Sequence, residues 1–145
     1  MRDILFRGKR KDNGEWVYGY YFERKDTQGN IIESVIIEDA YEQITSGQRY
    51  VRSNLGHECS RVIPETVGQF TGLTDKYGKE IFEGDIVEVV HEGVYKCRWD
   101  DGNLEFGLID GKESFGMAYV SPFDIAVIGN IYDNPELLEV EHEIE

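Results

Sequence analysis

The chain has 145 residues, 40% of them hydrophobic, which is enough for a buried core in one domain or in two small lobes. Twenty-nine acidic residues against fifteen lysines and arginines give a net charge of −14, which repels phosphate backbones and argues against binding to nucleic acid. No apolar run approaches the roughly 20 residues of a membrane-spanning helix, and the basic start of the chain lacks the apolar segment of a signal peptide. We therefore expect a cytoplasmic protein that does not bind membranes.

The content of glycine and aromatic residues favours β-sheet. Sixteen glycines against three prolines suit many turns, and nine tyrosines, seven phenylalanines and two tryptophans favour strands. The predicted fold class is mainly β, with α+β as the alternative. The two cysteines, Cys59 and Cys97, have no CxxC spacing, so we expect two reduced thiols packed as small apolar groups.

The N-terminal region is predicted to form a β-hairpin. Residues 3–6 and 15–22 would be its strands, joined by a polar turn that contains the hairpin dipeptide Asn13-Gly14. Alternation along the second strand leads us to expect Trp16 in the core. The basic cluster of residues 9–11 is interpreted as a solvated hairpin tip, with a phosphate contact as the alternative.

The next segment combines clear and ambiguous patterns. A turn at residues 25–30 precedes a β-branched run at 31–37, which is predicted as a strand. Residues 40–44 could form a helical turn, 50–52 a strand or a loop, and 54–60 a loop. That loop contains three consecutive residues that could be metal ligands or nucleophiles, His57, Glu58 and Cys59. A zinc site needs further ligands at set spacings, so a surface loop is the preferred interpretation.

The stretch from Val62 to Val89 is predicted to be a hairpin followed by a sharp break and an apolar strand. Asp75 is expected to hold the hairpin turn with its side chain, and Gly78 to supply a positive φ. Gly84 is expected where a side chain would clash, and Asp85 to cap the backbone after it. Short strands with glycine corners are typical of an SH3-like small barrel, so the predicted fold is such a barrel with an additional N-terminal β hairpin or sheet.

Further strands are predicted downstream. Alternation over residues 94–99 forms a second core stripe of Tyr95, Cys97 and Trp99. Asp100, Asp101 and Asn103 resemble a calcium-binding cluster, but no glutamate completes a twelve-residue loop, so a tight turn is the preferred interpretation.

The C-terminal part is predicted to hold two more strands and a short helix. Residues 114–120 would be a strand with Gly116 at a bulge, and 125–132, the longest apolar run, a central strand bent at Gly129. Asn134 and Pro135 suit the N-cap and first position of a short C-terminal helix.

The central stretch VIPETVGQFTGLTDKYGKEIFEGDIVEV resembles the core signature of the YopX family, small proteins encoded by bacteriophages and prophages. Residues 1–7 with 16–19 resemble the opening of the family, and 127–138 its closing motif. The resemblance implies a phage-associated, mainly β protein and no known reaction, cofactor or catalytic set. We expect one YopX-like domain over 1–145, with an N-terminal β part (1–60), a barrel-like core (61–138) and an acidic tail (139–145).

The sequence assembles no catalytic, cofactor-binding or metal-binding set, so we expect no cofactor and a non-enzymatic phage or prophage accessory protein in the cytoplasm of the host bacterial cell. The predicted role is a protein-binding module whose partners are a second copy of itself and an unidentified host or phage protein. One alternative is an acidic mimic of DNA that inhibits a host DNA-binding protein. The other is a hydrolase that would bring His57 or His91 near one of the residues Cys59, Cys97, Asp100 and Asp101.

Overall fold

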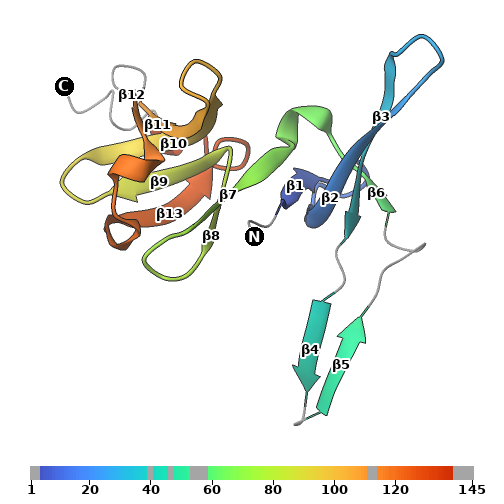
Figure 1. Cartoon of the computed structure of the whole chain (residues 1–145), viewed down its shortest axis with the longest axis horizontal. Coiled ribbons are helices and arrows are strands. Elements are labelled where there is room, and N and C mark those ends of the chain that lie inside the picture. The colour runs from blue at the N-terminus through green and yellow to red at the C-terminus, as the bar shows by residue number, and fades with distance from the viewer. Residues whose placement is uncertain (1–3, 39–40, 46–47, 53–58, 111–113, 139–145) are drawn as a thin grey trace. The chain divides into compact units, whose positions relative to one another are not determined.

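Antiparallel strands are the main elements of the computed structural model, which describes residues 4–38, 41–45, 48–52, 59–110 and 114–138 (Figure 1). The chain divides into two compact units. Residues 4–69 form the N-terminal unit, and residues 70–145 with the first three residues form the C-terminal unit. The boundary falls inside strand β7, nine residues beyond the predicted division between residues 60 and 61.

The N-terminal unit contains one larger sheet and a separate hairpin. In the larger sheet the strands are hydrogen-bonded in the order β6-β3-β2-β1-β7, and β4 pairs only with β5 among the described residues. The elements are β1 (Phe6–Lys9), β2 (Trp16–Lys25), β3 (Ile31–Glu38), β4 (Tyr41–Thr45), β5 (Gln48–Arg52), β6 (Cys59–Arg61), the short helix η1 (Pro64–Thr66) and the start of β7 (Gly68–Thr74).

The predicted helical turn at residues 40–44 is wrong, because β4 occupies most of that segment. β4 pairs with β5 from Tyr41↔Arg52 to Thr45↔Gln48, so both segments gain ladder hydrogen bonds that a single helical turn could not match. The predicted loop at 54–60 is also wrong at its end, because Cys59 and Ser60 belong to β6 and pair with β3.

The core of the N-terminal unit lies on the face of β2 opposite to the predicted one. Val17, Ile36 and Val62 are buried together, whereas Trp16 is only half-buried. The register sets this choice, because Val17 lies opposite Gly8, where Ile36 and Val62 pack closely enough to leave little space for a side chain. The expectation that Trp16 forms part of the core is therefore wrong.

The C-terminal unit is built around a five-stranded antiparallel sheet in the order β12-β11-β10-β9-β13. The later part of β7 pairs with β8 through Phe70↔Phe82 and Thr74↔Glu80. The remaining elements are β8 (Glu80–Phe82), β9 (Asp85–Val89), β10 (Gly93–Asp100), β11 (Glu105–Ile109), β12 (Ser114–Gly116), the short helices η2 (Met117–Tyr119) and η3 (Pro122–Asp124), and β13 (Ile125–Asn130).

The mainly β fold class is confirmed, but the sheet does not close into a barrel. β12 and β13 end the sheet on opposite sides, and no pairing joins them within the described ranges. The run at 125–132 is therefore an edge strand rather than the predicted central strand, and β10 is central. The expected irregularity at Gly129 is confirmed by a register shift between Val127 and Gly129.

The predicted hairpin turn before β8 is confirmed. The Oδ1 atom of Asp75 accepts hydrogen bonds from the backbone N–H groups of Tyr77 and Lys79, each at 2.9 Å, and Gly78 has a φ of +82°. Gly84 also has a positive φ, 94°. The carboxylate of Asp85 bonds backwards, accepting the N–H of Phe82 at 2.7 Å, whereas the sequence suggested a cap on the backbone that follows.

Side chains from most strands of the C-terminal unit form its core. Tyr95 and Cys97 are buried as predicted, but Trp99 is 41% exposed. The predicted core stripe of β10 therefore ends at Cys97. Trp99 lies at the end of β10, edge-on to Phe106, and its Nε1 donates to Asp101 at 2.8 Å beside the Asp100 turn. The buried set is Ile81, Val87, Val89, Tyr95, Cys97, Phe106, Leu108, Met117 and Ile125.

The end of the described chain differs from the prediction in two details. The strand at 114–120 stops at Gly116 and continues as η2. Glu136 begins a helical turn, and the backbone oxygen of Asn134 accepts the N–H of Leu137 at 3.1 Å, but the Asn134 side chain accepts the N–H of Asn130. Of the helices in the described part of the chain, none has the length or apolar character to cross a membrane.

Candidate functional site

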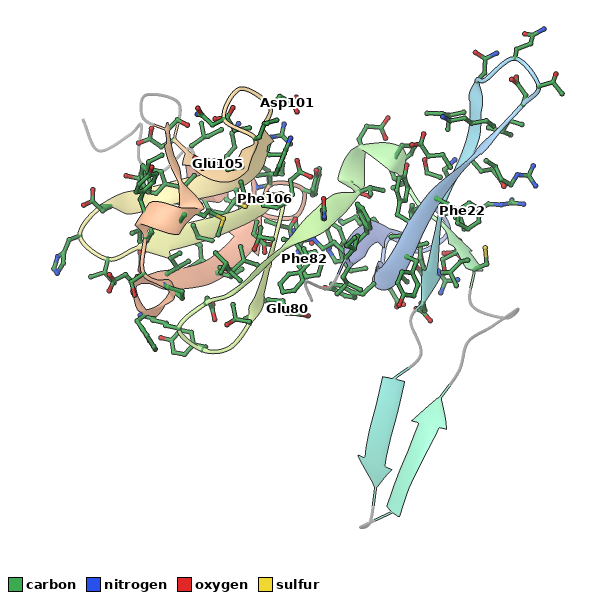
Figure 2. All side chains as sticks on the ribbon, viewed as in Figure 1. Phe22, Glu80, Phe82, Asp101, Glu105 and Phe106 are labelled. Atoms are coloured by element: carbon green, nitrogen blue, oxygen red, sulfur yellow. The ribbon has the colours of Figure 1, made fainter. Side chains whose placement is uncertain are left out.

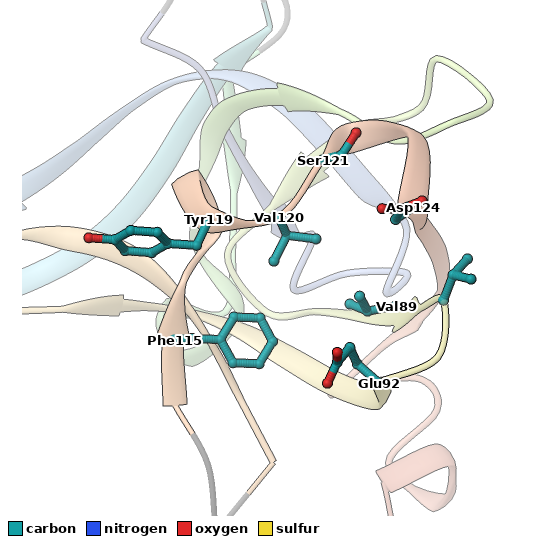
Figure 3. Close-up of a pocket in the computed structure, with 8 residues that line it drawn as sticks. Val89, Glu92, Phe115, Tyr119, Val120, Ser121 and Asp124 are labelled. Atoms are coloured by element: carbon teal, nitrogen blue, oxygen red, sulfur yellow. The ribbon is translucent and has the colours of Figure 1, made fainter.

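An open groove of about 350 Å³ lies in the C-terminal unit, where the end of β9, the β9–β10 turn, β12, η2 and η3 meet (Figure 3). These segments are far apart in sequence, and the sheet brings them together because β9 and β12 lie on either side of β10 and β11. The groove is lined by Val89, Val90, Glu92, Phe115, Tyr119, Val120, Ser121 and Asp124.

The apolar wall of the groove is held by the core behind it. Phe115 packs edge-on against the buried Tyr95, with their ring centroids 5.0 Å apart. Val89 is buried, and Val120 packs against the same core cluster. Figure 3 shows Phe115 and Val120 pointing toward one another. This part of the groove is therefore preformed and apolar.

Two short connections fix the rim. The hydroxyl of Tyr95 donates to the backbone oxygen of Glu92 at 3.2 Å, which ties the β9–β10 turn to the core. The backbone N–H of Val90 donates to the backbone oxygen of Asp124 at 3.0 Å, which ties η3 to the end of β9. As a result the side chains of Glu92 and Asp124 are both exposed at the groove, on different sides of Val89 in Figure 3.

Large aromatic side chains stand exposed next to the groove. Tyr119, the last residue of η2, is 84% exposed, and Phe123 in η3 is 82% exposed. Their backbones are ordered by η2 and by the Ser121 hydroxyl, which accepts the N–H of Phe123 at 3.3 Å. Exposed aromatic residues beside an apolar depression are typical of surfaces that bind other proteins.

Acidic residues are concentrated in the unit that carries the groove. The C-terminal unit has nineteen acidic residues and six lysines or arginines, a balance of −13, whereas the N-terminal unit has ten and nine, a balance of −1. Glu92 and Asp124 are the charged members of the groove lining, and no lysine or arginine is among those eight residues. The groove therefore lies in a negative electrostatic field.

A second surface with exposed aromatic residues lies on β2 in the N-terminal unit. Tyr18, Tyr20 and Phe22 alternate along one face of the strand and are exposed. Phe22 is labelled on β2 in Figure 2. On the same face the guanidinium of Arg7 lies 4.7 Å from the ring centroid of Trp16. Trp16 belongs to this face, so the residue expected in the core lies beside exposed aromatic side chains instead.

Two residues of the basic cluster, Arg10 and Lys11, border a second depression, of about 510 Å³, together with Cys59 and Arg61. Arg10 pairs with Asp12 at 2.8 Å, and Arg61 pairs at 2.7 Å with Glu33, which also pairs with Arg24. The choice between a solvated tip and a phosphate contact stays a prediction. Cys59 is exposed and Cys97 is buried, so only Cys97 packs as expected.

The residues that a hydrolase would need are not brought together in the C-terminal unit. His91 lies in the turn before β10, whereas Asp100 is the last residue of β10 and Asp101 follows it, roughly 23 Å away along the eight-residue strand. Cys97 is buried in the core, where its sulfur lies 3.5 Å from that of Met117. His57 and Glu58 are outside the described residues.

Two of the acids proposed for a calcium-like cluster serve the turn. Asp100 accepts the N–H of Gly102 at 2.9 Å and the side-chain amide of Asn103, and these bonds lower the pKa of Asp100. Asp101 accepts from Trp99. In the ranges that the structure describes, no three His, Cys, Asp or Glu side chains gather closely enough to hold a metal ion.

The groove has no signature in the local sequence pattern. A single strand over residues 114–120, as the sequence predicts, would place Phe115 and Tyr119 on the same face of a sheet. Tyr119 and Phe123, on either side of Pro122, could have indicated an exposed surface here. Aromatic residues in a proline-containing connection lie where solvent or a partner can reach them.

Fold and groove together define a small, mainly antiparallel β protein with two units, one of which presents an acidic, aromatic-edged groove. The chain belongs to the YopX family, since the family described as "YopX protein" matches residues 5–139. It is similar to the crystal structure of protein EF1440 from Enterococcus faecalis, with 25% sequence identity, a TM-score of 0.56, and coverage of 95% of this chain and 99% of that one. No curated protein matches the sequence.

Proposed function

We propose that this chain is a non-enzymatic accessory protein of a bacteriophage or prophage that binds other proteins in the host bacterial cytoplasm. The observation that carries the proposal is the groove between the β9–β10 turn and η2–η3, because it is preformed, apolar at its base and edged by exposed aromatic residues. Membership of the YopX family supports the phage or prophage origin. The partners are a host or phage protein and a second copy of the chain.

Capture of binding proteins from host lysate, with and without infection, tests this function. The bait is the wild-type chain, and the groove variant is Tyr119→Ala, which removes an 84% exposed ring without touching the core. Tyr77→Ala is the matched control, since Tyr77 is also an exposed tyrosine of the C-terminal unit but lies in the β7–β8 turn. Partners lost with Tyr119→Ala and kept with Tyr77→Ala support the proposal, whereas equal capture by all three baits contradicts it.

Self-association is tested by size-exclusion chromatography with light scattering. We expect a mass above that of the 16.7 kDa monomer at high micromolar concentration. A monomer under those conditions would restrict the function to binding of a different protein.

The concentration of acids in one unit favours a second candidate, mimicry of the DNA charge. The C-terminal unit has a balance of −13 against −1 for the N-terminal unit, and such an excess of acids is attracted to a basic surface. This candidate requires competition with duplex DNA for a basic host protein, and the competition should weaken as salt rises. If added salt leaves the competition unchanged, the charge-mimic candidate is eliminated and the groove remains the basis of binding.

A further inference from the structure

We infer that the groove of the C-terminal unit binds an extended, positively charged peptide segment of a partner protein, in which lysine or arginine residues alternate with aliphatic or aromatic ones. This inference rests on the proposed protein-binding function and names the chemistry of the segment. It is carried by two features of the groove, an apolar wall and two acidic side chains at the rim, which one ligand has to match at the same time.

The apolar character requires an apolar side chain from the partner. Phe115 and Val120 are half-buried and form a wall above the buried Val89, which the core holds in place through the Tyr95–Phe115 contact. A side chain that covers Phe115 and Val120 removes apolar area from water without reorganising the groove, so little ordering cost offsets the gain. The exposed ring of Tyr119 extends the same surface at the end of η2 (Figure 3).

The acidic character requires a cation next to that apolar group. Glu92 and Asp124 reach the groove from different elements, and the backbone bond between Val90 and Asp124 holds those elements together. A partner carboxylate would be repelled by both side chains, and a neutral segment would gain no attraction from these exposed charges. A lysine or arginine beside the apolar residue satisfies both conditions.

The shape of the groove favours an extended segment over a compact small molecule. It is open to solvent along its length, and its lining comes from a turn, a strand edge and two short helices. Extended peptides fit such surfaces because successive side chains point to opposite sides, so alternate residues can face the groove. The balance of −13 in this unit would additionally speed the encounter with a basic partner.

Fluorescence polarisation with four labelled octapeptides tests the inference on the full-length chain. The first alternates arginine with leucine, the second replaces arginine by the neutral isostere citrulline, the third replaces leucine by serine, and the fourth replaces arginine by glutamate. We expect the arginine–leucine peptide to bind most tightly and the glutamate–leucine peptide most weakly. The affinity of the arginine–leucine peptide should fall as salt is raised from 50 to 500 mM, because exposed charge pairs are screened.

Charge reversal with a matched control assigns binding to the groove. Glu92→Lys should weaken binding of the arginine–leucine peptide by roughly ten-fold, since an attractive contact becomes a repulsive one. Glu80→Lys produces the same net charge on another exposed glutamate of the same unit and should change the affinity by less than about two-fold. Equal weakening by both variants would show a general charge effect and would overturn the inference.

A gentler variant guards against misfolding of the charge reversal. The double substitution Glu92→Gln with Asp124→Asn keeps the shapes of both side chains and should weaken the same peptide by roughly five-fold. Circular dichroism of each variant confirms that the sheet is retained. Unchanged affinity in the folded double variant would overturn the inference.

The remaining outcomes separate this inference from the proposed function. If the citrulline–leucine peptide binds as tightly as the arginine–leucine peptide, and lysate partners still require Tyr119, the chain binds proteins through the groove but the cationic specificity is wrong. If partners are captured independently of the groove and no octapeptide binds, both are wrong. If the arginine–leucine peptide dissociates a homo-oligomer of the chain, the cationic segment belongs to a second copy, which supports the inference and identifies the partner.

Discussion

The same five-residue turn occurs once in each unit, at residues 26–30 and 75–79. In both, the first residue is an aspartate whose Oδ1 accepts the N–H groups two and four residues later at 2.9 Å. In both, the fourth residue is a glycine with a positive φ, +86° at Gly29 and +82° at Gly78. The pattern Asp-x-x-Gly is therefore sufficient to specify the turn in two different surroundings.

The two turns differ in what surrounds them. Asp26 is exposed, and its second oxygen accepts only a local bond from the side chain of Asn30 at 3.2 Å among the bonds that the described residues show. Asp75 is buried, and its Oδ2 accepts the N–H of Val127 in β13 at 2.9 Å. One residue further on, the N–H of Lys76 donates to the backbone oxygen of Ile125.

These extra bonds give the second turn a role that the first does not have. β13 is an edge strand, and the turn satisfies backbone groups on its open side that could otherwise pair with another chain. The comparison teaches that local sequence decides the geometry of a turn, whereas the elements packed around it decide how much it contributes to stability. Each unit also contains one tryptophan, Trp16 or Trp99, so fluorescence can follow the two units separately.

The largest effect is expected from the core beside the second turn. Leu108→Ala removes a fully buried side chain from the C-terminal cluster and should lower the free energy of unfolding of that unit by about 2–5 kcal/mol. Urea unfolding is measured in Trp16→Phe and Trp99→Phe backgrounds, which leave one reporter each. An equal loss at both reporters would show that the two compact units unfold together.

Replacing the turn aspartates tests the comparison directly. Asp75→Ala leaves three backbone N–H groups without their acceptor and should cost about 1–3 kcal/mol in the C-terminal unit. Asp26→Ala, the matched change in the exposed turn, should cost less, as followed by Trp16. If Asp26→Ala proves at least as destabilising, the argument that the surroundings determine the contribution fails.

Replacing the turn glycines should give equal effects. Gly29→Ala and Gly78→Ala each place a Cβ in the left-handed region, with no atom within 4 Å to clash with it. Each should therefore cost about 1 kcal/mol, the intrinsic penalty of that conformation. Urea midpoints give the measurement. A clearly larger loss at Gly78 would mean that the backbone, and not only the aspartate, responds to the surroundings.

The smallest effect is expected from pH. Burial acts to raise the pKa of Asp75, but the N–H groups of Val127, Lys79 and Tyr77 outweigh it and hold the pKa below the usual value. A carboxylate with a lowered pKa stabilises the folded state above its unfolded pKa, and this contribution is lost as the pH falls through the folded pKa. The difference in unfolding free energy between wild type and Asp75→Asn should therefore shrink below about pH 4.

The exposed aspartate makes a control for the pH experiment. The pKa of Asp26 is also lowered, chiefly by the backbone N–H of Asn30, so its contribution has the same sign. In the Asp26→Asn variant the loss of unfolding free energy at low pH that comes from Asp75 should persist. If this loss disappears in Asp26→Asn and remains in Asp75→Asn, the pH dependence comes from Asp26 and the prediction for Asp75 is wrong.

Several features could be predicted from individual residues, and others could not. The roles of Asp75 and Gly78 follow from turn chemistry alone, and the irregularity at Gly129 follows from the strand preference of its neighbours. Alternation correctly separated Trp16 from Val17, but only pairing with Gly8 decided which of them is buried. The single-domain organisation and the absence of enzymatic activity stay predictions.

The β class and the turns could be read from the chain alone, because each depends on the conformational preferences of a few adjacent residues, and the family could be read from its motifs. The open sheet, the position of β13 at its edge and the meeting of β9, β12 and η3 at an acidic groove became visible only in the folded molecule. These outcomes depend on residues distant in sequence, since Val89 and Phe115 line the same groove and the N–H of Val90 donates to the backbone oxygen of Asp124. Local patterns fix which face of a strand is apolar, but which strands become neighbours is set by packing of the whole unit.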